Sequence, residues 1–176
     1  RFELTPDIAC VAKGITGGTL PLGLTLTSEA VFQEFNDRDF SKAFLHGHSF
    51  TANSLSCAVA LTTLDLIEKE DICGRGLALE RTYANWLAQC KDRFELLHPR
   101  MIGSVLAFEM PGSGQSDYYH SNKQLIKDLS RQNGLLLRPL GNTIYITPPL
   151  AVTASEMNFA MEALAKTIEQ FTEALT

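Results

Sequence analysis

One lysine of this 176-residue chain stands where its amine could act as a nucleophile. Lys13 follows the apolar run of residues 8–12 (IACVA) and precedes the glycine-containing segment 14–18 (GITGG). An amine at the end of a buried strand is partly desolvated, which raises the fraction of neutral amine. Neutral amine is the form that condenses with an aldehyde to give a Schiff base. The same pattern also fits a solvated lysine at a strand end, which is the commoner case.

A second polar segment, residues 46–51 (HGHSFT), combines histidines with hydroxyl side chains. Ser49, Thr51 and the nearby backbone N–H groups precede a predicted helix, an arrangement that suits a phosphate group. The alternative is a cluster of helix-capping residues without a ligand. His46 and His48 have the spacing of some metal ligands, but no acidic or cysteine partner stands nearby at ligand spacing, so we expect no metal site.

Arg138 closes the apolar run of residues 135–137 (LLL) and is followed by Pro139. A buried arginine needs an anion beside it, and its planar guanidinium suits a carboxylate, so Arg138 is a candidate carboxylate clamp. In the alternative, its aliphatic stem lies along the sheet and its charge reaches water. Tyr145, on the neighbouring predicted strand, could line the same pocket, although packing in the core is the commoner role for such a residue.

Apolar patterning predicts the elements that would position these residues in the first part of the chain. Short apolar or alternating runs predict strands at residues 8–12 and 22–27, joined by the glycine-containing loop. Helical spacing of apolar residues then follows in three places: from residue 28 or 29, from 53 or 54 to 70, and from 72 to 94. Pro99 prevents any continuation of the last of these helices.

Beyond Pro99 the pattern changes to that of a compact α+β unit. It predicts, in order, a strand at 102–110, a helix at 122–132, strands at 135–138 and 143–146, and a final helix to about residue 174. Asn133-Gly134 closes the first of these helices, and a capping box at residues 153–156 opens the second. We therefore predict a small sheet with helices covering one face.

Composition and charge argue against several classes of protein. Hydrophobic residues make up 45% and charged residues 20% of the chain, as is usual for a globular protein. The net charge is −5 without a basic stripe, which argues against a nucleic-acid partner, and the longest apolar runs are too short to span a bilayer. The four cysteines form no C-x-x-C pair, so we expect buried free thiols. The chain opens without a secretory pattern, and we expect a cytoplasmic protein.

Taken together, three segments resemble the class III (ornithine-type) pyridoxal-phosphate aminotransferases. Residues 6–22 (PDIACVAKGITGGTLPL) resemble the segment of that family that carries the Schiff-base lysine. Residues 46–53 (HGHSFTAN) and 135–149 (LLLRPLGNTIYITPP) are similar to the branch of the family that acts in biotin biosynthesis. The segments occur in the family order and cover essentially the whole chain.

The resemblance implies an α/β fold built from two parts. Residues 1–98 would be the C-terminal portion of the large cofactor-binding domain of a PLP-dependent (fold type I) transferase. Residues 99–176 would be the small C-terminal α+β domain. The cofactor would be pyridoxal 5'-phosphate, and the full enzyme would be a homodimer whose active sites form at the subunit interface, with small-molecule substrates.

The resemblance also assigns roles to individual residues. Lys13 would hold the cofactor as a Schiff base and move the proton between the substrate α-carbon and the cofactor. His48 and Ser49 would contact the cofactor phosphate of the neighbouring subunit. Gly47 would offer a backbone contact to substrate, and Arg138 would grip the carboxylate of a long keto-acid substrate.

Two departures from the family pattern carry consequences. Many members of the biotin branch have Pro-Thr where this chain has His48-Ser49, and a serine hydroxyl can still donate to a phosphate. The family's upstream half carries an aspartate for the pyridinium nitrogen, a stacking aromatic residue and a Gly-Ser phosphate loop, and none of them has a counterpart in these 176 residues. We therefore expect this polypeptide by itself to have little or no transaminase activity.

Two alternatives to the biotin branch stay open. The first is another class III enzyme that acts on an ω-amine such as ornithine, 4-aminobutyrate or a polyamine, although the R-P-x-G setting of Arg138 favours the biotin branch. The second is a non-catalytic folding or dimerisation fragment. Within the biotin branch, the residues leave both adenosylmethionine and lysine open as amino donors.

Overall fold

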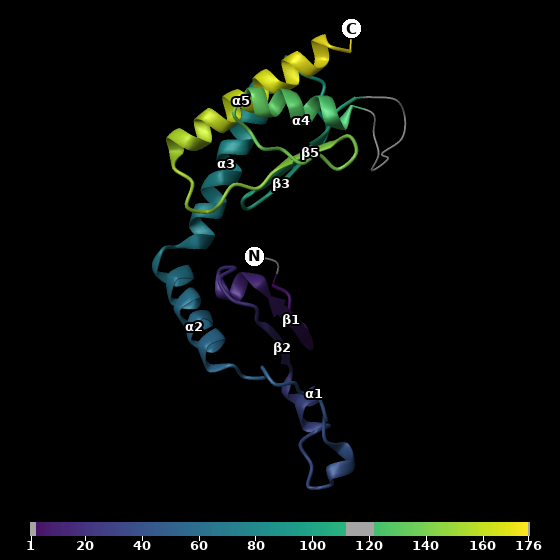
Figure 1. The fold of residues 1–176 in the computed structure, drawn as a ribbon, viewed down its shortest axis with the longest axis vertical. Coiled ribbons are helices and arrows are strands. Elements are labelled where there is room, and N and C mark those ends of the chain that lie inside the picture. Colours follow the sequence, from purple (N-terminus) through teal and green to yellow (C-terminus); the bar gives the residue numbers. More distant parts are fainter. Residues whose placement is uncertain (1–2, 112–121, 176) are drawn as a thin grey trace. The chain divides into compact units, whose positions relative to one another are not determined.

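The computed structural model describes residues 3–111 and 122–175 (Figure 1). Contacts between residues divide the chain into two units, Arg1–Glu70 and Asp71–Thr176, which are described separately below. The division falls upstream of the predicted boundary between residues 98 and 99, because the long helix that follows residue 71 shares a hydrophobic core with the second unit. The assignment of 1–98 and 99–176 to the two domains of a whole enzyme stays a prediction.

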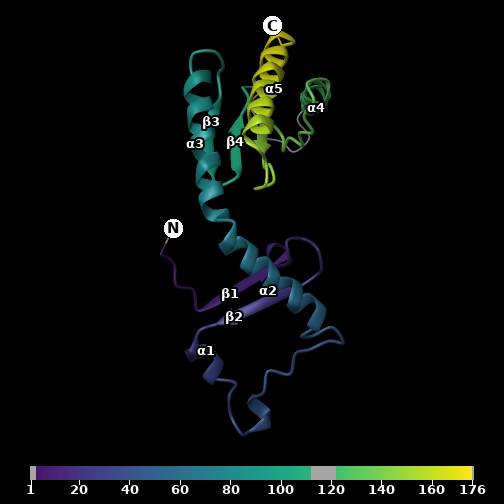
Figure 2. The same cartoon turned by 90° about the vertical axis from the view of Figure 1, so that its left-hand side faces the viewer.

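The first unit is built on an antiparallel strand pair. Strands β1 (Ile8–Ala12) and β2 (Gly23–Thr27) pair with Ile8 opposite Thr27 and Ala12 opposite Gly23. The remaining elements are η1 (Lys13–Thr16), α1 (Glu29–Gln33), η2 (Phe40–Lys42) and α2 (Ser54–Lys69). Both predicted strands and the helix starts near residues 28 and 53 are confirmed, and Figure 2 shows the strand pair and α2 from the side.

This first unit buries very little of its own apolar surface. Among its described residues, 3–70, only Thr16, Ser56 and Ala60 are buried. Large apolar side chains stay exposed on the strands, on α2 and on the connection between them, and they include Ile8, Leu26, Phe40, Phe44, Leu45, Phe50, Leu55 and Leu61. Exposed apolar surface of this extent marks a surface that other protein covers. The first unit therefore needs contacts beyond residues 3–70 to be stable.

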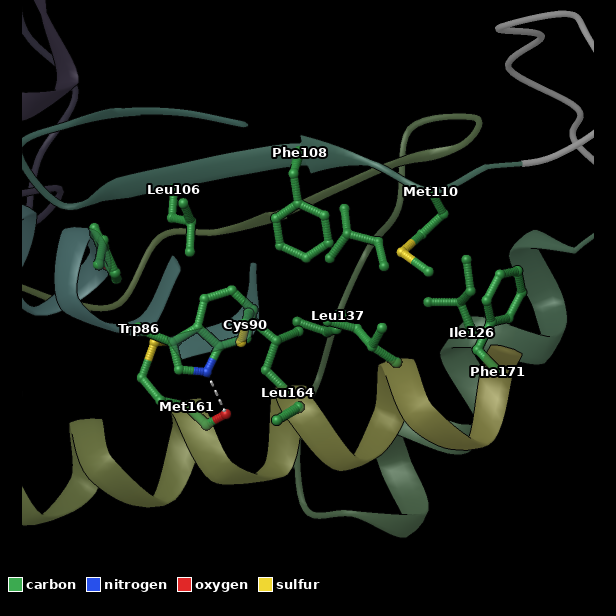
Figure 3. Packing of buried hydrophobic residues seen from close by; sticks show 14 of the residues in the cluster. Trp86, Cys90, Leu106, Phe108, Met110, Ile126, Leu137, Met161, Leu164 and Phe171 are labelled. Atoms are coloured by element: carbon green, nitrogen blue, oxygen red, sulfur yellow. Dashed lines mark hydrogen bonds between the residues drawn. The ribbon is translucent and has the colours of Figure 1, made fainter. Parts of the chain in front are cut away.

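The second unit packs helices against a three-stranded antiparallel sheet. The sheet has the order β3 (Leu97–Ile102), β4 (Val105–Glu109) and β5 (Thr143–Ile146). The helices are α3 (Ile72–Cys90), α4 (Lys123–Gln132) and α5 (Ala154–Glu173). Leu106 and Phe108 of β4 point toward Leu164 of α5 across the core (Figure 3). The predicted α+β unit is confirmed.

Two polar contacts fix α3 within this core. Trp86 Nε1 donates to the Met161 carbonyl of α5 at 3.1 Å, and its ring lies 6.0 Å from that of Phe108 (Figure 3). Tyr83 donates its hydroxyl to the Ser104 carbonyl at 2.9 Å, and burial raises the pKa of Tyr83 to about 12. The phenol therefore keeps its proton and remains a donor across the physiological range. These contacts explain why α3 belongs to the second unit.

The capping box predicted for the final helix forms as expected. The N–H of Glu156 donates to Thr153 Oγ1 at 3.3 Å, and the N–H of Thr153 donates to the Glu156 carboxylate at 2.8 Å. The bond from the Thr153 backbone, with a second from its hydroxyl, lowers the pKa of Glu156. The reciprocal pair satisfies backbone N–H groups that have no partner inside the helix. The chain therefore enters α5 at a defined residue.

The single strand predicted at residues 102–110 is wrong. The segment belongs to a hairpin in which β3 ends at Ile102, β4 begins at Val105, and the two pair with each other. Gly103 takes a φ of 54°, in the left-handed region that glycine adopts at little cost. A two-residue turn therefore fits inside what reads as one apolar run.

The strand predicted at residues 135–138 is also wrong. These residues take no regular structure, and only Leu140 pairs, through an isolated bridge to Thr143. Pro139 has no N–H to give to a ladder and is itself fully buried. The turn at Gly141-Asn142 therefore leads into β5 alone.

The prediction of buried free thiols is confirmed only in part. All four cysteines are free, but only Cys90 is buried, whereas Cys57 is half-buried and Cys10 and Cys73 are exposed. Burial raises the pKa of the Cys90 thiol, against a smaller opposite effect of the Arg93 charge. Across residues 3–111 and 122–175, every helix is too short or too polar to traverse a lipid bilayer.

Core packing in the second unit predicts an unequal response of two leucines. Leu164 is fully buried and Leu136 is 83% exposed. We expect Leu164→Ala to lower the free energy of unfolding by about 2–5 kcal/mol, because it leaves a cavity in the core. Leu136→Ala, the matched control, should change it by less than about 0.5 kcal/mol. Urea denaturation followed by fluorescence of the single tryptophan, Trp86, measures both, and equal effects would contradict the described core.

Candidate active site

The backbone of Lys13 has an unusual conformation. Lys13 is the first residue of η1, directly after β1, and its φ is 48°. A non-glycine residue in this left-handed region is strained by about 1–3 kcal/mol, and such strain persists only where surrounding contacts hold it. The Lys13 carbonyl accepts from the N–H of Gly18 and from the hydroxyl of Thr16, each at 3.2 Å. The loop itself thus supplies contacts that hold this conformation.

Thr16 joins both ends of residues 13–20, which we call the lysine loop. Its side chain is fully buried, and Thr16 Oγ1 lies 2.6 Å from the Leu20 carbonyl oxygen and 3.2 Å from that of Lys13. One hydroxyl proton is therefore shared between the two carbonyls, with the shorter contact to Leu20. Gly17 and Gly18 follow with φ of 58° and 78°, which lets the chain turn back toward β2.

The lysine loop packs against helix α2. Ser56 donates its hydroxyl to the Pro21 carbonyl at 3.4 Å, and a Cβ on Gly17 would lie 3.8 Å from Thr63 Oγ1. The start of α2 is fixed by Asn53, whose side chain accepts the Ser56 N–H at 3.0 Å. The lysine loop and the first turns of α2 are therefore one connected structure.

The desolvation expected for Lys13 is not provided by the described part of the first unit. Lys13 is exposed, as are its neighbours Ala12 and Gly14. The amine thus stands at the end of β1 and open to a ligand. Shielding of this amine has to come from a bound cofactor or from protein surface beyond residues 3–70.

Segment 46–51 is held by hydrogen bonds within itself. The N–H of His48 donates to Thr51 Oγ1 at 2.9 Å, and the N–H of Thr51 donates to the His48 carbonyl at 2.9 Å. The N–H of Phe50 donates to His48 Nδ1 at 3.2 Å. Since Nδ1 accepts, the neutral ring of His48 carries its hydrogen on Nε2. The ring of His46 stacks on Phe44 with centroids 5.5 Å apart.

These bonds change what segment 46–51 can offer to a phosphate. The N–H groups of His48, Phe50 and Thr51 are already used, so they do not form the expected cradle. The exposed side chain of Ser49 and Nε2 of His48 can still donate. Both residues fit a phosphate through side chains, and helix α2 begins several residues later. Among the described residues, a Cβ on Gly47 would meet Thr51 Oγ1 alone, at 3.7 Å, so their packing does not require glycine there.

Arg138 lies on a rigid connection in the second unit. It stands between Leu137 and Pro139, which are both buried, while Arg138 itself is exposed. Leu140 and Thr143 exchange two backbone hydrogen bonds of 2.9 Å directly after it. Within the described ranges, no carboxylate forms an ion pair with Arg138. The side chain is therefore a cation on a fixed backbone that is available to an anion.

The predicted site residues are divided between the two units of the chain. Lys13 and residues 46–51 belong to the first unit, and both connect to α2, but no hydrogen bond joins them in the part of the chain described here. Arg138 belongs to the second unit. No set of three or more His, Cys, Asp or Glu residues that could hold a metal occurs in residues 3–111 and 122–175. No role was predicted for Thr16, although a threonine just before two glycines is a usable signal for a turn.

Solved structures with the same fold are aminotransferases. An amine transaminase from an uncultivated Pseudomonas species, in the PLP-bound (internal aldimine) form, has a TM-score of 0.83 at 31% identity and covers 94% of this chain and 38% of its own. The adenosylmethionine-8-amino-7-oxononanoate aminotransferase of Methanocaldococcus jannaschii has a TM-score of 0.82 at 30% identity and covers 94% and 39%. The fold is thus an α/β part of a fold type I, PLP-dependent transferase.

The family follows from the sequence comparisons. The family described as "Aminotransferase class-III" matches residues 1–168, and this chain belongs to it. Curated relatives named adenosylmethionine-8-amino-7-oxononanoate aminotransferase are 36% identical in Helicobacter pylori and 37% identical in Geobacter sulfurreducens. These matches cover 97% and 98% of this chain, and the chain spans 39% of the length of each relative.

The loop geometry predicts a difference between two glycines beside Lys13. Gly17 has a φ of 58°, whereas Gly14 has no positive φ and no atom within 4 Å of an added Cβ. We expect Gly17→Ala to lower the free energy of unfolding by about 1–2 kcal/mol, since a side chain strains the left-handed conformation. Gly14→Ala, the matched control, should stay within about 0.5 kcal/mol. Urea denaturation of the full-length protein measures both free energies of unfolding. A larger loss for Gly14→Ala would contradict the described loop conformation.

Proposed function

We propose that this chain is part of the aminotransferase that converts 8-amino-7-oxononanoate to 7,8-diaminononanoate in biotin biosynthesis. S-adenosylmethionine is the proposed amino donor, and pyridoxal 5'-phosphate the cofactor. The names of the relatives in Helicobacter pylori and Geobacter sulfurreducens support the substrate. The main support for the proposal is the position of Lys13, which lies in a fixed loop at the end of β1 and is exposed.

Lys13 is the proposed catalytic residue. When bound, pyridoxal 5'-phosphate supplies an aldehyde and a ring that accepts the electron pair of the substrate α-carbon. Lys13 Nζ is the group that would hold the cofactor, through its aldehyde. With the cofactor bound, the Lys13 amine would carry a proton to and from the substrate α-carbon.

The remaining assignments concern binding. The Ser49 hydroxyl and His48 Nε2 donate to the cofactor phosphate, and we propose that they do so across a homodimer interface, to the neighbouring subunit's cofactor. Gly47 contributes its backbone to the substrate contact. Arg138 binds the carboxylate of the keto acid, because its charge stands on a backbone fixed by buried neighbours and is unpaired within the described ranges.

We further propose that residues 1–176 by themselves turn over little or no substrate. Three buried residues among positions 3–70 do not make a stable core, and the Lys13 amine is exposed rather than enclosed. Proton transfer in a Schiff-base enzyme needs a site from which bulk water is excluded. For the same enzyme we propose a cytoplasmic location, because the exposed free thiols of Cys10 and Cys73 suit a reducing compartment.

A second candidate function is transamination of another ω-amine by a class III enzyme. The similarity in fold to an amine transaminase, at 31% identity, supports this second function. Both functions share Lys13 and differ in the acid that Arg138 binds. Comparison of 8-amino-7-oxononanoate with ornithine, 4-aminobutyrate and a polyamine as substrates of the full-length enzyme separates them.

The role of Lys13 predicts a selective loss of cofactor linkage. In the full-length protein, Lys13→Ala should abolish the near-visible absorbance of the lysine-bound cofactor and reduce turnover by about 10²–10⁴-fold, since both the covalent link and the proton carrier are gone. Lys42, exposed in the same unit and paired with Asp37 at 2.6 Å, provides the control. Lys42→Ala should keep the absorbance and the turnover. A Lys13→Ala protein with the unchanged absorbance band would refute the assignment, and no band in the unsubstituted protein would favour the non-catalytic alternative.

The role of Arg138 predicts a change in one Michaelis constant. Arg138→Ala should raise the KM for the keto acid by about tenfold to a hundredfold, the equivalent of one charge-assisted hydrogen-bonded pair. Arg131, exposed in the same unit and 3.9 Å from Asp128, is the matched control, and Arg131→Ala should leave this KM unchanged. Steady-state kinetics with each substrate varied in turn measures the effect. If only the KM for the amino donor changed, the carboxylate-clamp assignment would be wrong.

A further inference from the structure

We propose that Thr16 is a positioning residue for Lys13: its buried hydroxyl holds the backbone conformation from which the lysine amine meets the cofactor. This inference rests on the proposed function and adds a residue to its site. Thr16 touches neither substrate nor cofactor in this proposal, and it acts only through Lys13.

The burial of Thr16 sets it apart from the rest of its loop. Thr16 is fully buried, whereas Lys13, Gly14, Gly17 and Gly18 around it are all exposed. A threonine hydroxyl is costly to bury unless it is hydrogen-bonded, and this one reaches two backbone carbonyls. The side chain is therefore fixed in place, and its contacts define the shape of the loop.

The contacts of Thr16 bear directly on Lys13. Thr16 Oγ1 lies 3.2 Å from the Lys13 carbonyl oxygen and 2.6 Å from that of Leu20, so it ties the residue that ends β1 to the segment that leads into β2. Lys13 has a φ of 48°, which a lysine does not keep without such contacts. Because φ sets the direction in which the side chain leaves the strand, a relaxed backbone would carry the amine away from its place.

The Lys13 carbonyl has a second hydrogen bond, so loss of the Thr16 hydroxyl can change the position of Lys13 without unfolding the loop. The N–H of Gly18 also donates to the Lys13 carbonyl, at 3.2 Å, and the loop is further anchored to α2 by the bond from Ser56 to Pro21. The loop thus keeps other contacts when the Thr16 hydroxyl is removed. We expect its overall path to survive and the conformation of Lys13 to become mixed.

The test uses the full-length enzyme with pyridoxal 5'-phosphate bound. Thr16→Val keeps the branched shape and removes the hydroxyl, and we expect kcat to fall by about tenfold to a hundredfold through misplacement of the amine, with the KM for the keto acid unchanged. The pH titration of the cofactor absorbance, which reports the environment of the lysine link, should shift in the same variant. Thr16→Ser retains the hydroxyl and should restore both kcat and the titration toward those of the unsubstituted enzyme.

Thr167 supplies a matched control for a structural effect alone. It is also a fully buried threonine, it lies in the second unit, and it donates to the Ala163 carbonyl at 2.8 Å. Thr167→Val should lower the melting temperature without changing the titration of the cofactor absorbance. If Thr16→Val and Thr167→Val behaved alike in kcat and absorbance, or if Thr16→Val changed neither, the proposal would be overturned.

Two further comparisons distinguish the proposed role of Thr16 from misfolding and from a failure of the proposed function. If Thr16→Val does not fold, Thr16→Ser and Thr16→Ala provide the comparison, because these two differ only in the hydroxyl. Ala is then expected to show the loss and Ser to show the recovery, and equal behaviour of the two would overturn the proposal. A failure of the proposed function is recognised separately, because the unsubstituted enzyme would then lack the lysine-bound cofactor absorbance altogether.

Discussion

The carbonyl group of Lys13 accepts hydrogen bonds from the Thr16 hydroxyl and the Gly18 N–H, and the lysine backbone is left-handed at that point. This constraint stands where β1 ends and the chain turns back into β2, and Lys13 is exposed there. The proposed chemistry requires an amine at a fixed place relative to a cofactor. The hydrogen bonds that the Lys13 carbonyl oxygen accepts fix the backbone from which the amine extends.

The two units differ in how much of their stability they provide themselves. The second unit closes a core around Trp86, Phe108 and Leu164, while the first leaves most of its apolar residues exposed. The lysine-bearing unit therefore depends on further protein surface, in keeping with a chain that spans 39% of the length of its curated relatives. Such surface could also shield the Lys13 amine.

Elements with a regular apolar period were predicted well from the sequence, and irregular backbone was not. The helices of residues 54–69 and 154–173 and the capping box at Thr153 have local signals that survive in the structure. The turn at Gly103 lies inside an apolar run, and the irregular path around Pro139 depends on tertiary packing, so neither was predicted. The resemblance to a family named Lys13 as a site residue, but apolar patterning does not reveal its positive φ or the burial of Thr16. Both depend on hydrogen bonds within residues 13–20 and on the packing of this loop.

Chemical mapping of the cofactor attachment shows which lysine of the enzyme binds pyridoxal 5'-phosphate. The full-length enzyme would be incubated with pyridoxal 5'-phosphate, reduced with borohydride and digested, and its peptides would be analysed by mass spectrometry. We expect a stable pyridoxyl group on Lys13 and on no other lysine of residues 1–176. A label on a different lysine, with Lys13 recovered unmodified, would contradict it.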